Sequence, residues 1–201
     1  MNGRLIVIEG IDGAGTETQS KMLLAHCKKE GEPAGRLEYP DYKGAFGGII
    51  KDFLSKGREL PVEMQFLFYA ADIAKDREKI ASMLAEGKAV ICDRYFTSTI
   101  AYQGVRGFYV KKSLRFAEDF GIRKPDVVIL LQITPQESAK RKRGENGKLD
   151  RNEEDMAFLE KVNRAYFELA SDNVFGRWFV IDGERPKELV FEDVLSVLSK
   201  I

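Results

Sequence analysis

The sequence predicts an α/β fold in which a parallel five-stranded sheet lies between two layers of helices, forming a three-layer α/β/α sandwich. Short runs of apolar, often β-branched residues alternate along the chain with longer amphipathic stretches, and this alternation is typical of strand–helix–strand units. Several short runs are apolar at every position, as strands covered on both faces are. The predicted strands are residues 5–8, 36–39, 89–92, 127–131 and 178–181.

Helical patterns fill the intervals between these strands. Glycines at positions 31, 57 and 87 follow charged helix ends, where glycine commonly terminates a helix. No internal repeat or long linker divides the chain, so residues 1–201 are expected to form a single domain. The predicted helices are residues 18–29, 48–55, 62–86, 111–120, 135–142, 155–171 and 188–200.

The composition excludes several classes of function. Thirty-two basic residues balance thirty-two acidic ones, so no overall positive field favours a nucleic acid or an acidic membrane as partner. No apolar run approaches the roughly 20 residues that span a bilayer, and a strand begins soon after Met1, so a cytoplasmic protein is expected. Cys27 and Cys92 lack a metal-ligand spacing and are expected to be reduced thiols. His26 is the only histidine, which excludes a His-dependent hydrolase.

The most informative segment is residues 5–20, with the sequence LIVIEGIDGAGTETQS. It has the frame of the phosphate-binding loop G-x-x-x-x-G-K-[ST], whose backbone N–H groups and helix N-terminus surround a phosphate. Gly10 and Gly15 have the correct spacing, but Thr16 replaces the lysine and Glu17 replaces the hydroxyl residue. The alternative is a glycine-rich turn between strand and helix that binds no ligand.

Carboxylates accompany this loop and a second strand. Glu9 and Asp12 flank the glycines, where carboxylates suit Mg²⁺ or sugar hydroxyls as partners. Asp93 and Arg94 end the apolar strand at 89–92, at the edge where open α/β sheets bind ligands. Asp93 would hold Mg²⁺ through water, and the planar fork of Arg94 would hold a phosphate. A structural ion pair is the alternative.

Three segments, EGIDGAG, DRYFTSTIAYQG (93–104) and SAKRKRGENGKLDRNE (138–153), together resemble the thymidylate kinases, which are P-loop nucleoside-monophosphate kinases. The resemblance runs from Leu5 to the carboxyl terminus. It implies a P-loop NTP hydrolase-like fold, a mobile lid at about 138–153, and transfer of the ATP γ-phosphoryl to dTMP with Mg²⁺, giving dTDP and ADP. It also implies ATP and dTMP as the partners and a homodimer, for which the predicted helix 62–86 offers an apolar stripe; packing of that stripe on the sheet is the alternative.

The resemblance also implies roles for individual residues. Tyr42 would bind the acceptor phosphate, Tyr69 would stack on thymine, and Arg151 would help to hold the closed lid. The catalytic residues would be Asp12, Arg94, Arg141 and Arg143. The ATP-binding residues would be Gly10, Ile11, Asp12, Gly13, Ala14, Gly15, Thr16, Glu17, Thr18, Arg141 and Arg185. The dTMP-binding residues would be Asp12, Tyr39, Tyr42, Tyr69, Arg94, Ser98, Tyr102 and Gln103. The metal shell would contain Asp93, Glu17 and Glu168.

Two departures from the family pattern leave the function open. Losing a well-placed cation costs about 3–4 kcal/mol of transition-state stabilisation, so Thr16 requires compensation. Arg141 and Arg143 of the lid would provide it; Thr18 would supply the missing hydroxyl one position later, and Glu17 would ligate Mg²⁺ directly. Ile73 stands where the family usually has an arginine that binds thymine, and Arg77 lies one helical turn on. The sequence is therefore compatible with an active thymidylate kinase, a deoxynucleoside-monophosphate kinase with shifted acceptor preference, or a non-catalytic nucleotide-binding protein.

Overall fold

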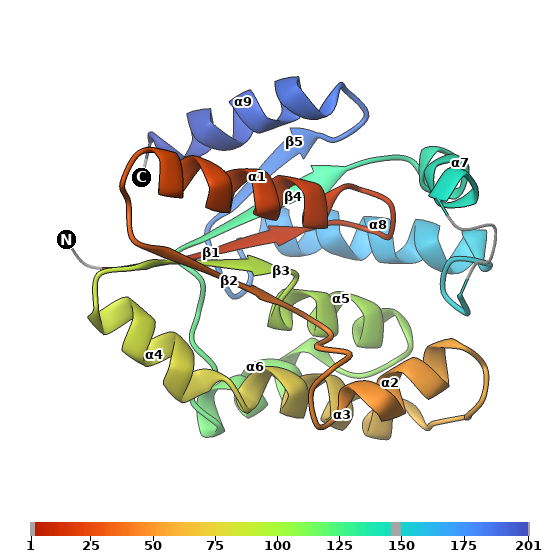
Figure 1. Ribbon diagram of the computed structural model, residues 1–201. Coiled ribbons are helices and arrows are strands. Elements are labelled where there is room, and N and C mark those ends of the chain that lie inside the picture. The colour runs from red at the N-terminus through yellow and green to blue at the C-terminus, as the bar shows by residue number, and fades with distance from the viewer. Residues whose placement is uncertain (1–2, 146–149, 201) are drawn as a thin grey trace.

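The computed structural model describes residues 3–145 and 150–200, with the backbone alone for 143–145. Its centre is a five-stranded sheet in the order β2-β3-β1-β4-β5, in which every neighbouring pair is parallel. This confirms the predicted sheet (Figure 1). The strands are β1 (Arg4–Glu9), β2 (Ala34–Glu38), β3 (Ala89–Asp93), β4 (Val127–Gln132) and β5 (Trp178–Asp182).

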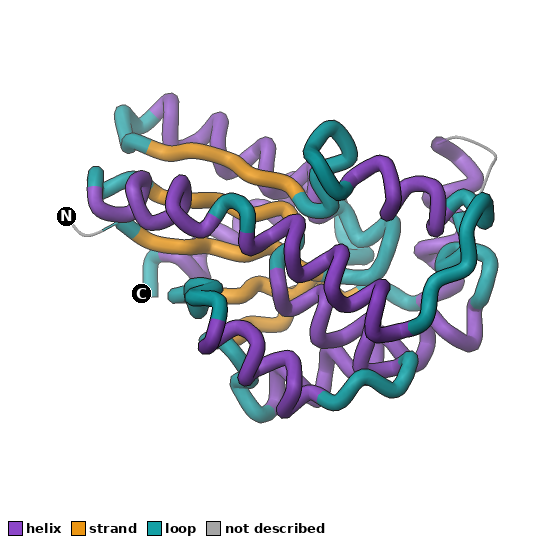
Figure 2. The backbone as a smooth tube through the Cα atoms, turned by 90° about the horizontal axis from the view of Figure 1, so that it is seen from below, coloured by secondary structure: helices purple, strands orange, loops and turns teal. Residues whose placement is uncertain are grey.

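Helices cover both faces of the sheet, whose strands run across the view of Figure 2. The first face carries α1 (Thr16–Lys29) and α9 (Lys187–Leu198), which pack against each other. The opposite face carries α5 (Phe96–Val105) and α8 (Met156–Ser171), with α3 (Val62–Ala74) packed on α5 (Figure 1). The remaining helices are α2 (Gly47–Leu54), α4 (Arg77–Ala85), α6 (Val110–Asp119) and α7 (Pro135–Glu145).

The three central strands form the core of the molecule. Their side chains are almost completely buried on both faces, which is why their sequences are continuously apolar rather than alternating. The register pairs Ile8 of β1 with Asp93 of β3. The residues that follow β1 and β3 therefore emerge side by side at one edge of the sheet.

The predicted helix 62–86 is in fact two helices, α3 and α4. The break lies at Lys75 and Asp76, where Asp76 leaves helical geometry at φ −97° and ψ 4°. The Asp76 carboxylate accepts hydrogen bonds from the Tyr39 hydroxyl (3.1 Å) and the Lys75 ammonium (2.8 Å). These contacts fix the turn, whereas the apolar spacing continues across it and so predicted one helix.

The apolar stripe proposed for dimerisation belongs to the core of this chain. Phe66, Ile73 and Ile80 are each at most 3% exposed, and Met83 packs against the same core. The stripe therefore packs within the chain, as the alternative interpretation held. A homodimer would need another surface.

Helix α5 was missed by the sequence analysis. Most of its residues are buried, including Phe96, Thr97, Ile100 and Tyr102, because the helix lies between α3 and α8. A helix buried on nearly all sides shows no amphipathic pattern, and the threonines in FTSTIAYQGV lower its intrinsic helix propensity.

In the described ranges, no helix combines the length and apolar character needed to cross a membrane.

Two adjacent glycines test how closely α2 packs on the segment that carries Tyr42. A Cβ on Gly47 would lie 2.3 Å from the Asp41 carbonyl oxygen and 2.5 Å from Tyr42 Cα, whereas a Cβ on Gly48 would have nothing within 4 Å. We expect Gly47→Ala to destabilise the fold by about 1–3 kcal/mol, because the backbone would have to move. Gly48→Ala should be neutral or stabilise it by up to about 1 kcal/mol, because alanine favours the helix. Urea unfolding of both variants measures the contrast, and equal effects would contradict the packing.

Candidate active site

The loop between β1 and α1 has the shape of an anion-binding cradle. Gly15, at φ 94°, lies in the left-handed region that favours glycine and immediately precedes α1. Gly10 lets the two sides of the loop approach each other closely, because a Cβ at this position would lie 2.6 Å from Ala14 Cβ. The first N–H groups of α1 have no acceptor within the helix and carry its positive dipole end. The loop therefore retains its phosphate-binding backbone although Thr16 replaces the lysine.

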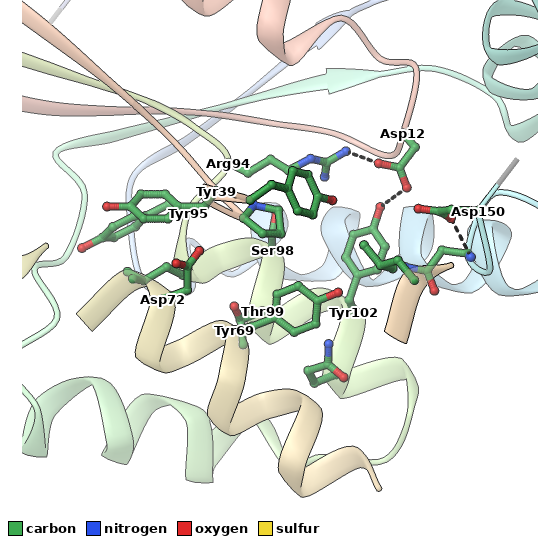
Figure 3. Close-up of a pocket in the computed structure, with 16 residues that line it drawn as sticks. Asp12, Tyr39, Tyr69, Asp72, Arg94, Tyr95, Ser98, Thr99, Tyr102 and Asp150 are labelled. Atoms are coloured by element: carbon green, nitrogen blue, oxygen red, sulfur yellow. Dashed lines mark hydrogen bonds and ion pairs between the residues drawn. The ribbon is translucent and has the colours of Figure 1, made fainter. Parts of the chain in front are cut away.

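Arg94 joins this loop to a neighbouring cavity. Its backbone adopts φ 61° directly after β3, and its Nη1 donates to the Gly10 carbonyl at 2.6 Å. Its Nη2 donates to Asp12 Oδ1 at 2.7 Å, and the Tyr102 hydroxyl donates to Asp12 Oδ2 at 3.2 Å (Figure 3). The structure thus brings together the predicted residues Asp12, Arg94 and Tyr102.

The Glu9 carboxylate is buried and is not a metal or sugar ligand. Its Oε1 accepts from the backbone N–H groups of Tyr95 (3.1 Å) and Ser98 (3.0 Å) and from the Thr97 hydroxyl (2.5 Å). Its Oε2 accepts from the hydroxyls of Ser98 (2.5 Å) and Tyr166 (2.9 Å). Burial raises the pKa of Glu9, while Arg94 and these hydrogen bonds oppose the rise. Glu9 therefore anchors the turn that carries Arg94 to the end of β1.

Asp93 lies on the other side of the loop and is already paired. Its Oδ2 accepts from Arg36 Nη2 at 2.6 Å, and the nearby Thr16 hydroxyl lowers the pKa of its carboxyl. Burial raises the pKa of Asp93, and these partners together with Arg94 oppose the rise. Sequence reasoning did not identify Arg36, because no local motif connects a residue of β2 with the end of β3.

The predicted acceptor-side residues line one cavity (Figure 3). These are Asp12, Tyr39, Tyr42, Tyr69, Arg94, Ser98, Tyr102 and Gln103.

Their side chains have different amounts of hydrogen-bonding capacity left for a ligand. Among the described residues the buried Gln103 Oε1 has no hydrogen-bond partner within the chain. Tyr42 and Tyr69 are neutral phenols at physiological pH, and desolvation raises the pKa values of both further. The Ser98 hydroxyl, in contrast, is occupied by Glu9 and Tyr166, and the Tyr39 hydroxyl is occupied by Asp76.

The base end of the cavity contains an acid rather than an arginine. Ile73 lines the cavity and is 3% exposed, so it offers no hydrogen-bond donor. Arg77 does not replace it, because its Nη1 donates to the Phe120 carbonyl at 3.3 Å. Asp72, which the sequence analysis did not select, also lines the cavity; its Oδ2 accepts the Asp41 N–H at 2.8 Å, and its Oδ1 lies 3.0 Å from Lys75 Nζ.

Helix α7 lies on the phosphate-binding loop. The Ser138 hydroxyl donates to the Asp12 carbonyl at 2.6 Å. Arg141 donates to the carbonyls of Gly13 (3.3 Å) and Gly183 (3.0 Å) and to Glu137 (2.9 Å). The structure therefore places Arg141 at the loop as predicted, whereas the Arg143 side chain lies outside the described residues.

The segment after α7 is held against α2. The Arg151 guanidinium pairs with Glu59 at 2.6 Å, donates to the Phe53 carbonyl at 3.1 Å, and lies 4.5 Å from the centre of the Phe53 ring.

The structure does not bring the side chains of several other predicted residues to the loop's anion cradle. Glu168 is exposed on α8 in a separate groove, which Gly104 and Tyr109 also line. Glu17 is exposed and paired with Lys21, and Thr18 is exposed one position further on. Arg185 follows β5 and forms an ion pair with Asp193 of α9.

The resemblance is confirmed at the level of the family. The family model described as thymidylate kinase matches residues 8–194. The chain belongs to the thymidylate kinase family. It is 35% identical to the thymidylate kinase of Caldanaerobacter subterraneus subsp. tengcongensis, over all of this chain and 97% of that protein. It is 31% identical to the human enzyme of that name, over 98% of this chain and 90% of that protein, and 30% identical to that of Plasmodium falciparum, over 99% and 91%. The sheet order 2-3-1-4-5 agrees with the P-loop kinase fold expected for this family.

The residues present fit Mg²⁺ as an ion held partly by phosphates and water rather than by a full set of protein ligands. Among the described side chains, no three His, Cys, Asp or Glu residues gather as a metal cluster. Mg²⁺ in phosphoryl-transfer sites is commonly held by one or two carboxylates, by phosphates and by water. Asp93 would supply such a carboxylate, although one of its oxygens is held by Arg36.

Asp150 provides a pH-dependent test of this site. It lines the cavity, and burial together with the charge of Asp12 raises its pKa from 3.8 to about 6. A raised acid pKa means that ionisation costs stability, so the penalty grows as pH rises from about 4 through 6. We expect Asp150→Asn to raise the free energy of unfolding by roughly 1 kcal/mol more at pH 7.5 than at pH 4.5, after allowance for solvent screening. In the wild type, Asp150 Oδ1 accepts hydrogen bonds from the backbone N–H groups of Asn152 and Glu153. The amide oxygen of an asparagine at this position can still accept both.

Asp119→Asn on the exposed face of α6 is the control for this measurement. Chemical unfolding across the pH range measures both variants. A pH-independent difference between the Asp150→Asn protein and the wild type would contradict the raised pKa.

Proposed function

We propose that this protein transfers the γ-phosphoryl group of ATP to dTMP and produces dTDP and ADP. The observation that carries the proposal is the position of Arg94, whose guanidinium contacts the phosphate-binding loop and also lines the acceptor cavity. A cation at this junction can hold the acceptor phosphate beside the group that is transferred. A protein that only bound a nucleotide would not need a cation there.

Phosphoryl transfer depends mainly on positioning and on charge stabilisation. The loop from Gly10 to Thr16 binds the donor phosphates through its N–H groups, and Arg94 and Tyr42 orient the acceptor phosphate. Tyr69 contacts the base, and Tyr102 packs where a 2′-hydroxyl would lie and so favours a deoxyribose. Mg²⁺, when bound, neutralises charge on the donor phosphates, and Asp93 holds it through water.

The segment 138–153 acts as a lid over the donor in this proposal. Arg141 already contacts the loop, and closure of the segment would bring its positive charge onto the transferred phosphoryl group together with that of Arg143. Arg151 holds the end of the lid against α2. Residues 1–201 act as one kinase domain, and a homodimer would form through a surface other than the stripe on α3 and α4.

A second candidate is a deoxynucleoside-monophosphate kinase with another acceptor, and Asp72 favours it. The cavity contains a buried carboxylate beside Ile73. Each of its oxygens already has one partner in the chain, Asp41 N–H or Lys75, and can accept one more hydrogen bond. A carboxylate accepts a hydrogen bond from an amino group such as that of cytosine, whereas it repels a keto oxygen of thymine.

An acceptor panel tests both candidates. The purified protein is given ATP and Mg²⁺ with dTMP, dUMP, dCMP or dGMP, and ADP release is measured. We expect ADP release with dTMP, and looser discrimination than an arginine at position 73 would give. ADP release with dCMP and not with dTMP would support the second candidate. If none of the four acceptors gave ADP release, both candidates would be contradicted.

Substitution of Arg94 tests its role directly. We expect Arg94→Ala to lower kcat/KM for dTMP by about 10²–10³, because a charge-stabilising donor is lost from a buried site. Arg115→Ala on the exposed face of α6 is the control and should leave kcat/KM unchanged. Unaltered kcat/KM in the folded Arg94→Ala protein would refute the role of Arg94 at the site of transfer.

A further inference from the structure

The phosphate-binding loop lacks its own cation, but a partly buried arginine of β2 lies near its end. Thr16 occupies the lysine position, and its hydroxyl lies near enough to Asp93 to lower the pKa of that carboxyl. The same carboxylate accepts from Arg36, which belongs to β2, the strand next to β3 at the edge of the sheet. The position that has lost a lysine is therefore separated from a guanidinium by a single shared carboxylate.

The Arg36 guanidinium is fixed by three different acceptors. Its Nε donates to Ser20 Oγ at 2.8 Å, its Nη1 to Glu38 at 2.6 Å, and its Nη2 to Asp93 at 2.6 Å. The Ser20 hydroxyl in turn donates to the Glu17 carbonyl in the first turn of α1. Only 12% of the Arg36 side chain is exposed. The charge is thus held between the start of α1 and the end of β3.

Of the two carboxylates that pair with Arg36, only Asp93 is buried and needs a cationic partner. Glu38 is 57% exposed on its side chain and can be solvated without a partner. Asp93 is buried beside the loop, where a triphosphate would add further negative charge. An arginine at this place compensates both charges, and it does so from the rigid sheet, before any lid closes. Arg141 differs in this respect, because it reaches the loop from α7.

We propose that Arg36 supplies, from strand β2, the positive charge that a loop lysine would supply for binding the triphosphate donor. Arg36 acts in part through Asp93 and the first turn of α1, and it is therefore a positioning and charge-balancing residue. The inference rests on the proposed function only in that it takes a nucleoside triphosphate as donor.

The test measures binding rather than turnover. ATP with Mg²⁺ and, separately, dTMP are titrated by calorimetry into the wild type, Arg36→Gln, Thr16→Lys and the double variant. We expect Arg36→Gln to weaken ATP binding 10- to 100-fold and dTMP binding less than 2-fold. Thr16→Lys should restore ATP binding in the Arg36→Gln background to within about 3-fold of the wild type, and should add little in the wild-type background.

Two further variants separate charge from structure. Arg36→Lys keeps the positive charge but not the planar guanidinium, and it should retain ATP affinity within about 5-fold. If Arg36→Gln does not fold, ATP binding is measured on Arg36→Lys instead. Arg123→Gln is a control, because Arg123 pairs with Asp126, which lies beside the first residues of β1 and thus at the opposite end of the sheet.

Three outcomes would overturn the proposal. They are unchanged ATP affinity in Arg36→Gln, an equal loss of ATP and dTMP affinity, and a loss that neither Thr16→Lys nor Arg36→Lys repairs. If ATP binding follows the expected pattern while the acceptor panel yields no ADP, the proposed reaction fails and the role of Arg36 stands. If ADP is released and ATP affinity does not depend on Arg36, the proposed reaction stands and the role of Arg36 fails.

Discussion

The buried carboxylate of Glu9 is the constraint on which the arrangement of the site depends. It ends β1 and accepts five hydrogen bonds from the turn after β3, from the start of α5 and from Tyr166 of α8. A buried carboxylate without such donors would be strongly unfavourable, so the turn is held in one geometry. That turn contains Arg94 in the left-handed conformation, which directs its guanidinium to the Gly10 carbonyl and to Asp12. The phosphate-binding loop and the acceptor cavity are thereby fixed relative to each other.

The positive charge of the site comes from the fold rather than from the loop. Arg94 follows β3, Arg36 lies on β2, and Arg141 lies on α7, and each contacts the loop or a partner of the loop. These residues are far apart in the sequence, but the parallel order of β2, β3 and β1 brings the strand ends to one edge. The absence of a lysine at position 16 therefore removes one cation from the site, and other elements can supply the positive charge in its place. A loop motif judged alone understates what the site can bind.

The sequence predicted those parts of the molecule that have a local signal. Four of the five strands could be read from apolar runs, and the loop from its glycines, because both patterns arise from neighbouring residues; β2, with the sequence AGRLE, has a weaker signal. The contacts of Glu9, the Arg36–Asp93 pair and the carboxylate of Asp72 could not be read, because their partners lie on other elements. Two wrong predictions also come from contacts between elements. Helix α5 was missed because it is buried on nearly all sides and so lacks a polar face. Helices α3 and α4 were predicted as one helix because the apolar spacing continues across Asp76. Glu168 was assigned from the resemblance, and the structure places it in another groove.

The most direct test of the central claim is the affinity for dTMP of a Glu9→Gln variant, compared with that of Tyr166→Phe. Glutamine keeps the shape of Glu9 but places an amide donor among groups that are themselves donors, so the turn carrying Arg94 should move. Tyr166→Phe removes a single donor and leaves the other four hydrogen bonds of Glu9. We predict that calorimetry at a temperature where both proteins are folded will show dTMP binding at least 10-fold weaker in Glu9→Gln and within 3-fold of wild type in Tyr166→Phe. Wild-type dTMP affinity in a folded Glu9→Gln protein would contradict the claim that this carboxylate sets the position of Arg94.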